Sequence, residues 1–201
     1  PNEAIGRVPD AAWKAKVHAA NPAAFPFPDW LPGDNIQSAV GQGDMLVTPI
    51  QLASAYAAFA NGGTLRVPRL AAEVLNADGT KVRDLQPIVT ANVPVPARDS
   101  ILSGLTGVVS GKGGTAVGAF SGFAPGLVAG KTGTAQVQGR QNTSLFVGLT
   151  PAGAPKYLVL AVVEEGGYGA ETAAPIVRRI MQGLNGLPQA PVVTLPPPDG
   201  N

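Results

Sequence analysis

Hydrophobic residues at helical spacing predict two well-defined helices in the middle of the chain. The segment TPIQLASAYAAFANGG, residues 48–63, has a Thr-Pro start, an Asn-Gly-Gly end, and only Gln51 and Ser54 as polar residues between them. A helix that is apolar nearly all round is a buried one, so we expect it at the centre of the core. Apolar residues at helical spacing over 101–109 predict the second helix, which Gly111 ends.

Weaker patterns predict a helix near each end of the chain. Residues 10–20 can form a short helix with Asp10 as its N-cap, within an opening segment that repeated prolines otherwise keep irregular. Residues 172–184 carry an apolar stripe that predicts a closing helix. Arg178 and Arg179 lie off that stripe, so we expect them on a solvated face.

Apolar and β-branched segments predict three consecutive strands, at residues 127–137, 143–149 and 156–164. Their connections are too short for helical crossovers, so the strands are expected to be antiparallel neighbours. The third strand is an unbroken apolar run, which indicates a strand covered on both faces. Residues 64–95 are turn-rich and extended, and Asp78-Gly79 predicts a hairpin turn there.

Composition narrows the classes of function. Of the 201 residues 45% are apolar and 13% charged, and the net charge is +1, so nucleic acid is not an expected partner. The chain has no cysteine, which excludes disulfides, thiolate metal sites and a cysteine nucleophile. His18 is the one histidine and is expected to be solvated, and no metal site or cofactor is expected. No apolar run approaches the ~20 residues of a membrane helix, and no signal peptide is visible.

The segment GLVAGKTGTAQV, residues 126–137, raises the question of what Lys131 binds. A phosphate-binding P-loop requires a glycine five positions before Gly130, where the chain has Pro125. A P-loop lysine also opens a helix, whereas Thr-Gly-Thr-Ala-Gln-Val after Lys131 is typical of a strand. The sequence therefore argues against nucleotide binding.

A strand bearing Lys-Thr-Gly-Thr at a sheet edge suits a peptide carboxylate instead. Lys131 supplies a fixed ammonium, and Gly133, on the same face, lets a substrate backbone approach and pair with the edge. Thr132 and Thr134 bring hydroxyls, and Thr134 also brings a backbone N–H that could stabilise an oxyanion. On the motif alone, a solvated lysine in a turn-prone strand remains the simpler interpretation.

The sequence resembles the penicillin-binding proteins, the serine acyl-transferases that cross-link peptidoglycan. Lys-Thr-Gly is one of the three active-site motifs of that family. The resemblance is closest to the C-terminal half of a class B transpeptidase domain of the PBP2 elongation type. It covers about residues 1–187 and is carried, in order, by GRVPDAAWKAK, WLPGDNIQSAVGQGDMLVTPIQLASAYAAFANGG, VAGKTGTAQV and SLFVGLTPAGAPKYLVLAVVEEGGYGAETAAPIVRRIM.

The resemblance implies an α+β fold of the β-lactamase and transpeptidase type, an antiparallel five-stranded sheet flanked by helices. This chain would supply about three strands and the closing helix, with residues 126–137 at the active-site edge. Residues 157–163 would lie inside the sheet, beside a strand from the other half of the domain. Residues 1–187 would be the C-terminal part of the transpeptidase domain, and the Pro-rich tail 188–201 is expected to be disordered.

Carried over by position, the resemblance assigns roles to the motif. Lys131 would anchor the substrate carboxylate region and join the catalytic hydrogen-bond network, and the Thr134 N–H would be one oxyanion donor. Thr132, Gly133 and Thr134 would bind substrate, the two threonines through their hydroxyls, and Gln136 would line the groove. The cleft would be rimmed by two loops, residues 138–142 and 165–170.

The other two motifs of the family are absent from these residues, because no serine is followed three positions later by lysine and no Ser-x-Asn occurs. We therefore expect the nucleophile on a separate upstream segment, the N-terminal half of the same protein. The implied reaction is a two-step acyl transfer from a D-Ala-D-Ala stem peptide to an amine, and β-lactams would acylate the same serine. The resemblance also implies an extracytoplasmic domain anchored upstream, with a membrane glycosyltransferase as partner.

Two alternatives stay open. In a D,D-carboxypeptidase or a β-lactamase-like hydrolase, which share Lys-Thr-Gly, water would accept the acyl group. In a catalytically inactive penicillin-binding-fold module, the whole protein would lack Ser-x-x-Lys and would only bind partners.

Overall fold

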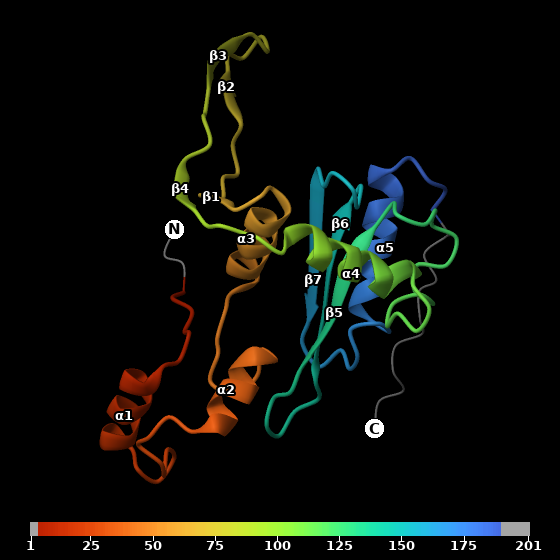
Figure 1. The fold of residues 1–201 in the computed structure, drawn as a ribbon. Coiled ribbons are helices and arrows are strands. Elements are labelled where there is room, and N and C mark those ends of the chain that lie inside the picture. Colours follow the sequence, from red (N-terminus) through yellow and green to blue (C-terminus); the bar gives the residue numbers. More distant parts are fainter. Residues whose placement is uncertain (1–3, 190–201) are drawn as a thin grey trace, which may run out of the picture.

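A three-stranded antiparallel sheet with helices packed on it forms the centre of the molecule (Figure 1). The computed structural model describes residues 4–189. The strands follow the order β5-β6-β7, with α5 packed on β6 and β7 and α4 packed on β5. Their bounds are Ala129–Ala135 for β5, Thr143–Thr150 for β6, Tyr157–Val163 for β7, Arg98–Ser110 for α4 and Ala173–Leu184 for α5. The predicted α+β fold, with its three strands and closing helix, is confirmed.

Three helices and two small antiparallel sheets precede this centre. Strand β1 pairs with β4, and β2 pairs with β3 in a hairpin that projects away from the other elements (Figure 1). The hairpin turn contains Gly79 at φ +84°, as Asp78-Gly79 predicts. The bounds are Ala11–Ala20 for α1, Pro32–Ala39 for α2, Pro49–Ala60 for α3, Thr64–Arg66 for β1, Glu73–Leu75 for β2, Lys81–Asp84 for β3 and Val89–Asn92 for β4.

Strand register decides which residues share a face of the central sheet. Lys131 lies opposite Val147, and Thr132 lies opposite Phe146. Side chains of directly opposed residues are on the same face, and successive residues alternate between faces. Lys131 therefore lies on the face of Val147, and Thr132 lies on the face of Phe146.

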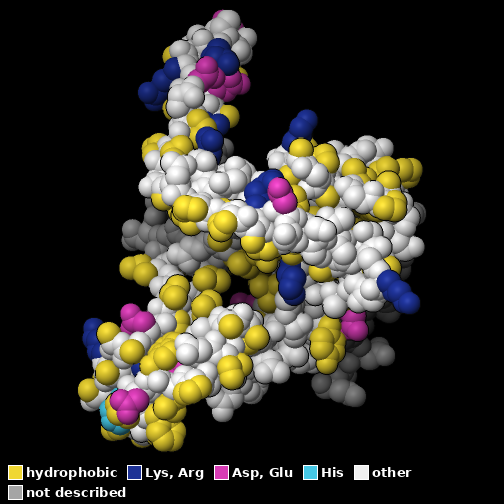
Figure 2. Space-filling view, in the orientation of Figure 1, with side chains coloured by type: hydrophobic (Ala, Val, Ile, Leu, Met, Phe, Trp, Pro, Cys, Tyr) yellow, Lys and Arg dark blue, Asp and Glu magenta, His cyan; other side chains and the backbone are white. Residues whose placement is uncertain are grey.

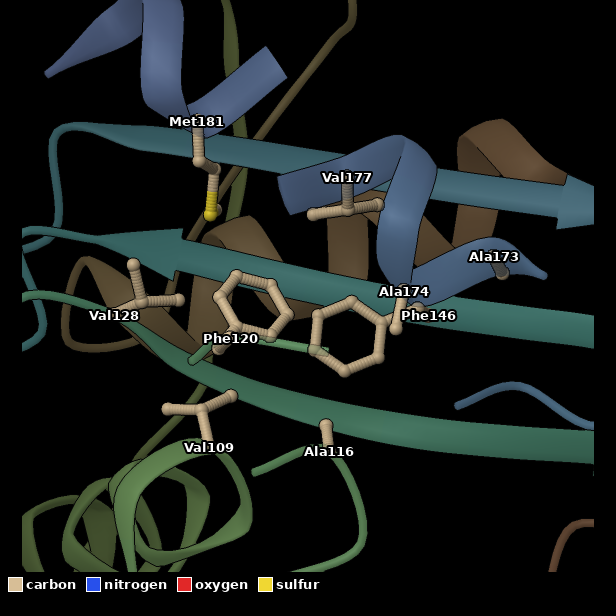
Figure 3. Close-up of a cluster of buried hydrophobic side chains, with 9 residues drawn as sticks. All are labelled: Val109, Ala116, Phe120, Val128, Phe146, Ala173, Ala174, Val177 and Met181. Carbon is tan, nitrogen blue, oxygen red and sulfur yellow. The ribbon is translucent and has the colours of Figure 1, made fainter. Parts of the chain in front are cut away.

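Each face of the sheet has its own hydrophobic cluster. The cluster on the Phe146 face gathers side chains from α4, the loop after it, β6 and α5 (Figure 3). Its members are Val109, Ala116, Phe120, Val128, Phe146, Ala173, Ala174, Val177 and Met181. The cluster on the opposite face consists of Ala60, Leu102, Leu105, Ala129, Leu149 and Ala152. Helix α4 packs on β5 and contributes to both clusters, with Val109 in the first and Leu102 and Leu105 in the second.

The Phe146 ring requires a glycine on the neighbouring strand. A Cβ at residue 130 would lie 2.5 Å from Cζ of Phe146, closer than carbon atoms can pack. Phe146 has no exposed surface and stacks on Phe120 at a centroid distance of 5.2 Å. Gly130, the residue before Lys131, is therefore needed for core packing.

Capping residues predicted from the sequence mark the ends of several helices. The Asp10 side chain accepts a hydrogen bond from Trp13 N–H at 2.7 Å, which caps α1 as predicted. Thr48 and Gln51 form a capping box at the start of α3, and Pro49 occupies the first helical position. Gly111 ends α4 as predicted.

One expectation about these elements is wrong, and two stay predictions. Residues 32–39 of the opening segment are helical and not irregular, because Pro32 starts α2 instead of breaking it, as proline can at the first helical position. Helix α3 is largely half-buried within the described residues, with Ala60 packed against Leu102 and Leu105 of α4, and its predicted place at the centre of the core stays a prediction. Strand β7 is half-buried over residues 158–163 and pairs with β6 alone in the described part of the chain, so its predicted cover on both faces, beside a strand from the other half of the domain, stays a prediction.

Apolar side chains between residues 27 and 50 are exposed on the surface of the described part of the chain. Figure 2 shows hydrophobic side chains gathered where the α1–α2 segment faces α3 and the central sheet. Exposed members in this part of the sequence are Phe27, Leu31, Ile36, Val40, Leu46, Val47 and Ile50.

Two side chains expected in solvent make structural contacts. Arg178 is half-buried and donates a hydrogen bond to the Ser121 carbonyl at 2.9 Å, and it lies 6.0 Å from the Phe123 ring centroid. The His18 Nδ1–H donates to the Phe25 carbonyl at 2.7 Å, closing the loop after α1. The expected disorder of the Pro-rich tail concerns residues that, from 190 onward, lie outside the described part of the chain.

An ion pair joins α1 to α2. Lys14 Nζ lies 2.5 Å from Asp34 Oδ2, and Leu31 N–H donates to the same oxygen at 2.7 Å. The hydrogen bond from Lys14, with that from Leu31 and the charge of Lys14, holds the pKa of Asp34 below its ordinary value of 3.8. The charged carboxylate is thus the form that holds this segment together.

Replacing Phe146 by alanine should destabilise the domain by about 3–5 kcal/mol, because the change leaves a large cavity in the core. Thermal unfolding of the full-length protein measures the effect as a lowered midpoint. Phe27→Ala is the matched control, because Phe27 is 60% exposed. Equal midpoints for the two variants would contradict the packing described above.

The α1–α2 contact should weaken in acid. A carboxyl group whose folded pKa is lowered stabilises the fold above its unfolded pKa and loses that contribution as the pH falls through the folded pKa. Amide hydrogen exchange over residues 31–38, corrected for intrinsic rates, should therefore accelerate as the pH falls below the ordinary value of 3.8. Asp34→Asn should exchange faster at neutral pH and lack this acid step; identical pH profiles would refute the assignment.

Candidate active site

Strand β5 is an edge strand of the central sheet within the described residues, and it carries the Lys-Thr-Gly-Thr motif. Lys131 is exposed, and its Nζ donates to the Thr132 carbonyl at 2.7 Å. The ammonium therefore lies against the backbone of the strand edge. The prediction that Lys131 is on an edge strand, not at the start of a helix, is confirmed.

The backbone of Thr134 is directed away from β6. Its carbonyl accepts a hydrogen bond from Gln42 Nε2 at 3.0 Å, so it points out of the sheet toward the unpaired edge. In a strand the N–H and C=O of one residue point the same way, so the Thr134 N–H is also directed to that edge. This is the orientation that an oxyanion donor requires.

Thr132 is paired with a second hydroxyl. Its Oγ1 lies 2.8 Å from Oγ1 of Thr115, in the loop after α4. Ala116 is buried and its N–H donates to the Val108 carbonyl at 2.9 Å, which fixes the loop. A Cβ at residue 114 would lie 2.2 Å from the Gly107 carbonyl oxygen, so this close turn requires Gly114. Two hydroxyls on one side of the strand edge can together bind a carboxylate.

Thr115 was not among the residues that the sequence singled out. The Gly-Gly-Thr-Ala segment reads as part of a long glycine-rich loop, and nothing in it indicates a partner on a strand seventeen positions away. The position of Thr115, between Gly114 and the buried Ala116, indicates a role at the strand edge only when the packing of the loop is known.

The far end of β5 is covered by the two loops that were expected to rim the cleft. The Gly167 N–H donates to the Asn142 carbonyl at 3.0 Å, which joins loop 165–170 to loop 138–142. Gly169 is buried over Gly133, and a Cβ at residue 169 would lie 2.5 Å from the Gly133 carbonyl oxygen. The loops therefore lie beside the end of the motif strand.

Gln136 lies beyond the end of β5 and lines a cavity of about 650 Å³. The cavity lies between the segment after β5 and the α1–α2 segment, and we call it the α1–α2 cavity. It is lined by Pro9, Trp13, Lys14, Trp30, Asp34, Gln37, Ser38, Gln42, Gly43, Asp44, Gln136, Val137 and Gln138. Gln42 belongs both to this lining and to the Thr134 contact.

The structure brings Lys131, Thr132, Gly133 and Thr134 together along one strand edge, with Gln136 further along at the cavity. Among residues 4–189 no group of three or more His, Asp or Glu side chains could hold a metal ion. In the same part of the chain no helix has the length and hydrophobicity to cross a membrane.

Comparison with known proteins identifies the family. The model of the penicillin-binding protein transpeptidase domain matches residues 12–182. The peptidoglycan D,D-transpeptidase MrdA of Haemophilus influenzae is 31% identical over 195 residues, which cover 89% of this chain.

Two solved structures share the fold. PBP2 of Pseudomonas aeruginosa, solved in complex with WCK 5153, has a TM-score of 0.71 and 37% identity, over 90% of this chain and 38% of that one. Penicillin-binding protein A of Mycobacterium tuberculosis, solved as an imipenem acyl-enzyme, has a TM-score of 0.62 and 27% identity, over 74% of this chain and 33% of that one. The chain spans 29% of the length of the Haemophilus relative. This chain therefore belongs to the penicillin-binding protein transpeptidase domain family.

Proposed function

We propose that this chain forms one wall of the active site of a serine-type peptidoglycan D,D-transpeptidase. The observation that carries the proposal is the β5 edge, where the Lys131 ammonium lies against the strand backbone, the Thr132 hydroxyl is paired with that of Thr115, and the Thr134 backbone points outward. These groups match the needs of a peptide ending in a carboxylate, whose scissile carbonyl develops negative charge as it is attacked.

The serine nucleophile and its base would come from the part of the parent protein that this chain does not span, since Ser-x-x-Lys and Ser-x-Asn are absent from these residues. The serine oxygen attacks the carbonyl carbon of the D-Ala-D-Ala bond, and the C–N bond breaks. The terminal D-Ala leaves as the amine, carrying the proton from the serine. An amine of a neighbouring stem then attacks the ester and releases the serine with its proton.

Each residue of the β5 edge has a role in this proposal. Lys131 stabilises negative charge and joins the hydrogen-bond network of the incoming serine. The hydroxyls of Thr132 and Thr115 bind the substrate carboxylate, and the Thr134 hydroxyl, two residues along on the same face of β5, assists them. The Thr134 N–H is one oxyanion donor, and Gly133 leaves room for the substrate backbone. No metal or other cofactor takes part in this scheme.

The wider setting follows from the same proposal. Residues 1–187 would be the C-terminal part of the transpeptidase domain and would pack on its N-terminal half, covering the exposed apolar side chains of α3 and β7. Substrates would be peptidoglycan stem peptides, and β-lactams would acylate the same serine. The similar penicillin-binding protein A of Mycobacterium tuberculosis forms an acyl-enzyme with the antibiotic imipenem. The domain would act outside the cytoplasmic membrane, beside a membrane glycosyltransferase.

Lys131→Ala in the full-length protein should lower the rate of acylation by a labelled penicillin by about 10²–10³-fold, the usual effect of removing one transition-state donor. Lys156→Ala is the matched control, because Lys156 is an exposed lysine just before β7. Covalent labelling after denaturation measures both rates. Near-normal labelling of Lys131→Ala would remove Lys131 from the site.

Stem-peptide analogues given to the full-length protein with an amine acceptor should yield a cross-linked product. Release of the acid alone would identify a carboxypeptidase or another hydrolase, in which water accepts the acyl group. Failure of the full-length protein to retain labelled penicillin, together with a gene that lacks Ser-x-x-Lys, would identify a catalytically inactive module.

A further inference from the structure

One buried hydroxyl beside the motif strand has no role in the acyl-transfer scheme described so far. Ser144 lies on β6 directly opposite Thr134, and none of its surface is exposed. We propose that Ser144 is a positioning residue, which holds loop 165–170 in place and through that loop sets the orientation of the Thr134 N–H. This inference rests on the proposed function, since it concerns the oxyanion donor of the same site.

The Ser144 hydroxyl joins three elements of the fold. Its Oγ–H donates to the Tyr168 carbonyl at 3.1 Å, and its Oγ accepts from the Ala173 N–H at 3.1 Å. Tyr168 belongs to loop 165–170, and Ala173 is the first residue of α5. One hydroxyl on β6 therefore holds both ends of the segment that connects this loop to the helix.

Helix α5 receives its N-terminal cap from Ser144. The N-cap residue, Thr172, makes no side-chain bond to the first turn, and its hydroxyl donates instead to the Gly166 carbonyl at 2.6 Å. The first N–H groups of a helix have no partner within the helix. Ala173 has no exposed surface, so Ser144 supplies the oxygen that its N–H requires.

The segment held by Ser144 packs on the peptide group that carries the proposed oxyanion donor. The Gly133 carbonyl and the Thr134 N–H belong to one planar peptide group. A Cβ at residue 169 would lie 2.5 Å from the Gly133 carbonyl oxygen and 2.4 Å from that of Leu145, so the Gly169 backbone lies directly against this part of the sheet. A shift of Gly169 would therefore free that peptide group to rotate.

Rotation of this peptide group would affect the reaction in a specific way. Its N–H is directed to the unpaired edge and its carbonyl to β6, as the outward Thr134 carbonyl requires. A rotation about the strand axis would turn the N–H away from the oxyanion position. Because an oxyanion donor stabilises the transition state more than the bound substrate, the rotation would slow acylation and leave substrate binding nearly unchanged.

The variant Ser144→Ala in the full-length protein tests the inference. It removes both hydrogen bonds and leaves the buried Ala173 N–H without its partner. The acylation rate at saturating labelled penicillin should fall roughly 10-fold, less than the 10²–10³-fold that removal of a whole donor causes. The half-saturating penicillin concentration should change by less than about 2-fold, because binding before the reaction does not use the donor.

Two further variants separate hydrogen bonding from packing. Ser144→Thr and Ser144→Val add side chains of nearly equal volume, and only the threonine keeps a hydroxyl. The Ser144→Thr variant should acylate roughly 10-fold faster than Ser144→Val, the same factor that the loss of the hydroxyl causes in Ser144→Ala. This comparison decides the question by itself if Ser144→Ala does not fold.

Thr150→Val is the matched control for the loss of a buried hydroxyl. Thr150 is also on β6 and fully buried, and its Oγ1 bonds the Leu127 carbonyl at 3.0 Å, at the end of the strand away from Thr134. This variant should lower the midpoint of thermal unfolding, as Ser144→Ala does, but keep the wild-type acylation rate. Titration of the labelled sites corrects each rate for the fraction of folded protein.

The outcomes distinguish this inference from the proposed function. A wild-type maximal rate in folded Ser144→Ala would overturn the inference alone, and so would equal losses of rate in Ser144→Ala and Thr150→Val. A raised half-saturating concentration with an unchanged maximal rate would overturn it too. A wild-type protein that penicillin does not label would overturn the proposed function, and this inference with it.

Discussion

The register between β5 and β6 is the constraint on which the site depends. With Lys131 opposite Val147, the lysine shares one face with a buried valine while Thr132 shares the other with Phe146. A slip of one residue would exchange these faces and also turn the Thr134 backbone inward, toward β6. Phe146 prevents such a slip, because its ring occupies the space that only a glycine at position 130 leaves open.

Hydrophobic packing on both faces of the sheet holds the β5 edge in place. Helix α4 contributes to both hydrophobic clusters, and the loop that follows it carries Thr115 to the Thr132 hydroxyl. At the other end of the strand, Gly169 lies on the backbone of Gly133 with no room for a side chain. The polar groups of the edge are thus held by apolar contacts and glycine turns, which is how a preorganised site is built without strong ionic interactions.

Local signals in the sequence predict most of the fold, because caps and strand patterns act over a few residues. Asp10, Thr48 and Gly111 mark helix boundaries where the structure has them. Contacts distant in sequence leave no such signal: neither the Gln42–Thr134 bond nor the Thr115–Thr132 pair could be read from the chain. The expected burial of α3 and β7 stays a prediction, since an apolar run indicates that a partner is needed but not whether the described residues supply it.

The β2–β3 hairpin lies apart from the packed elements of the molecule. Its strand residues are all exposed, and none of them belongs to either hydrophobic cluster. Backbone pairing joins β2 to β3, and Lys81 adds an exposed ion pair to Glu73 across the strands at 3.1 Å. Because the hairpin projects from the body (Figure 1), its tip can carry a fluorophore or an affinity tag without touching the core or the β5 edge. The molecule thus offers an attachment point for a label that leaves both hydrophobic clusters and the motif strand untouched.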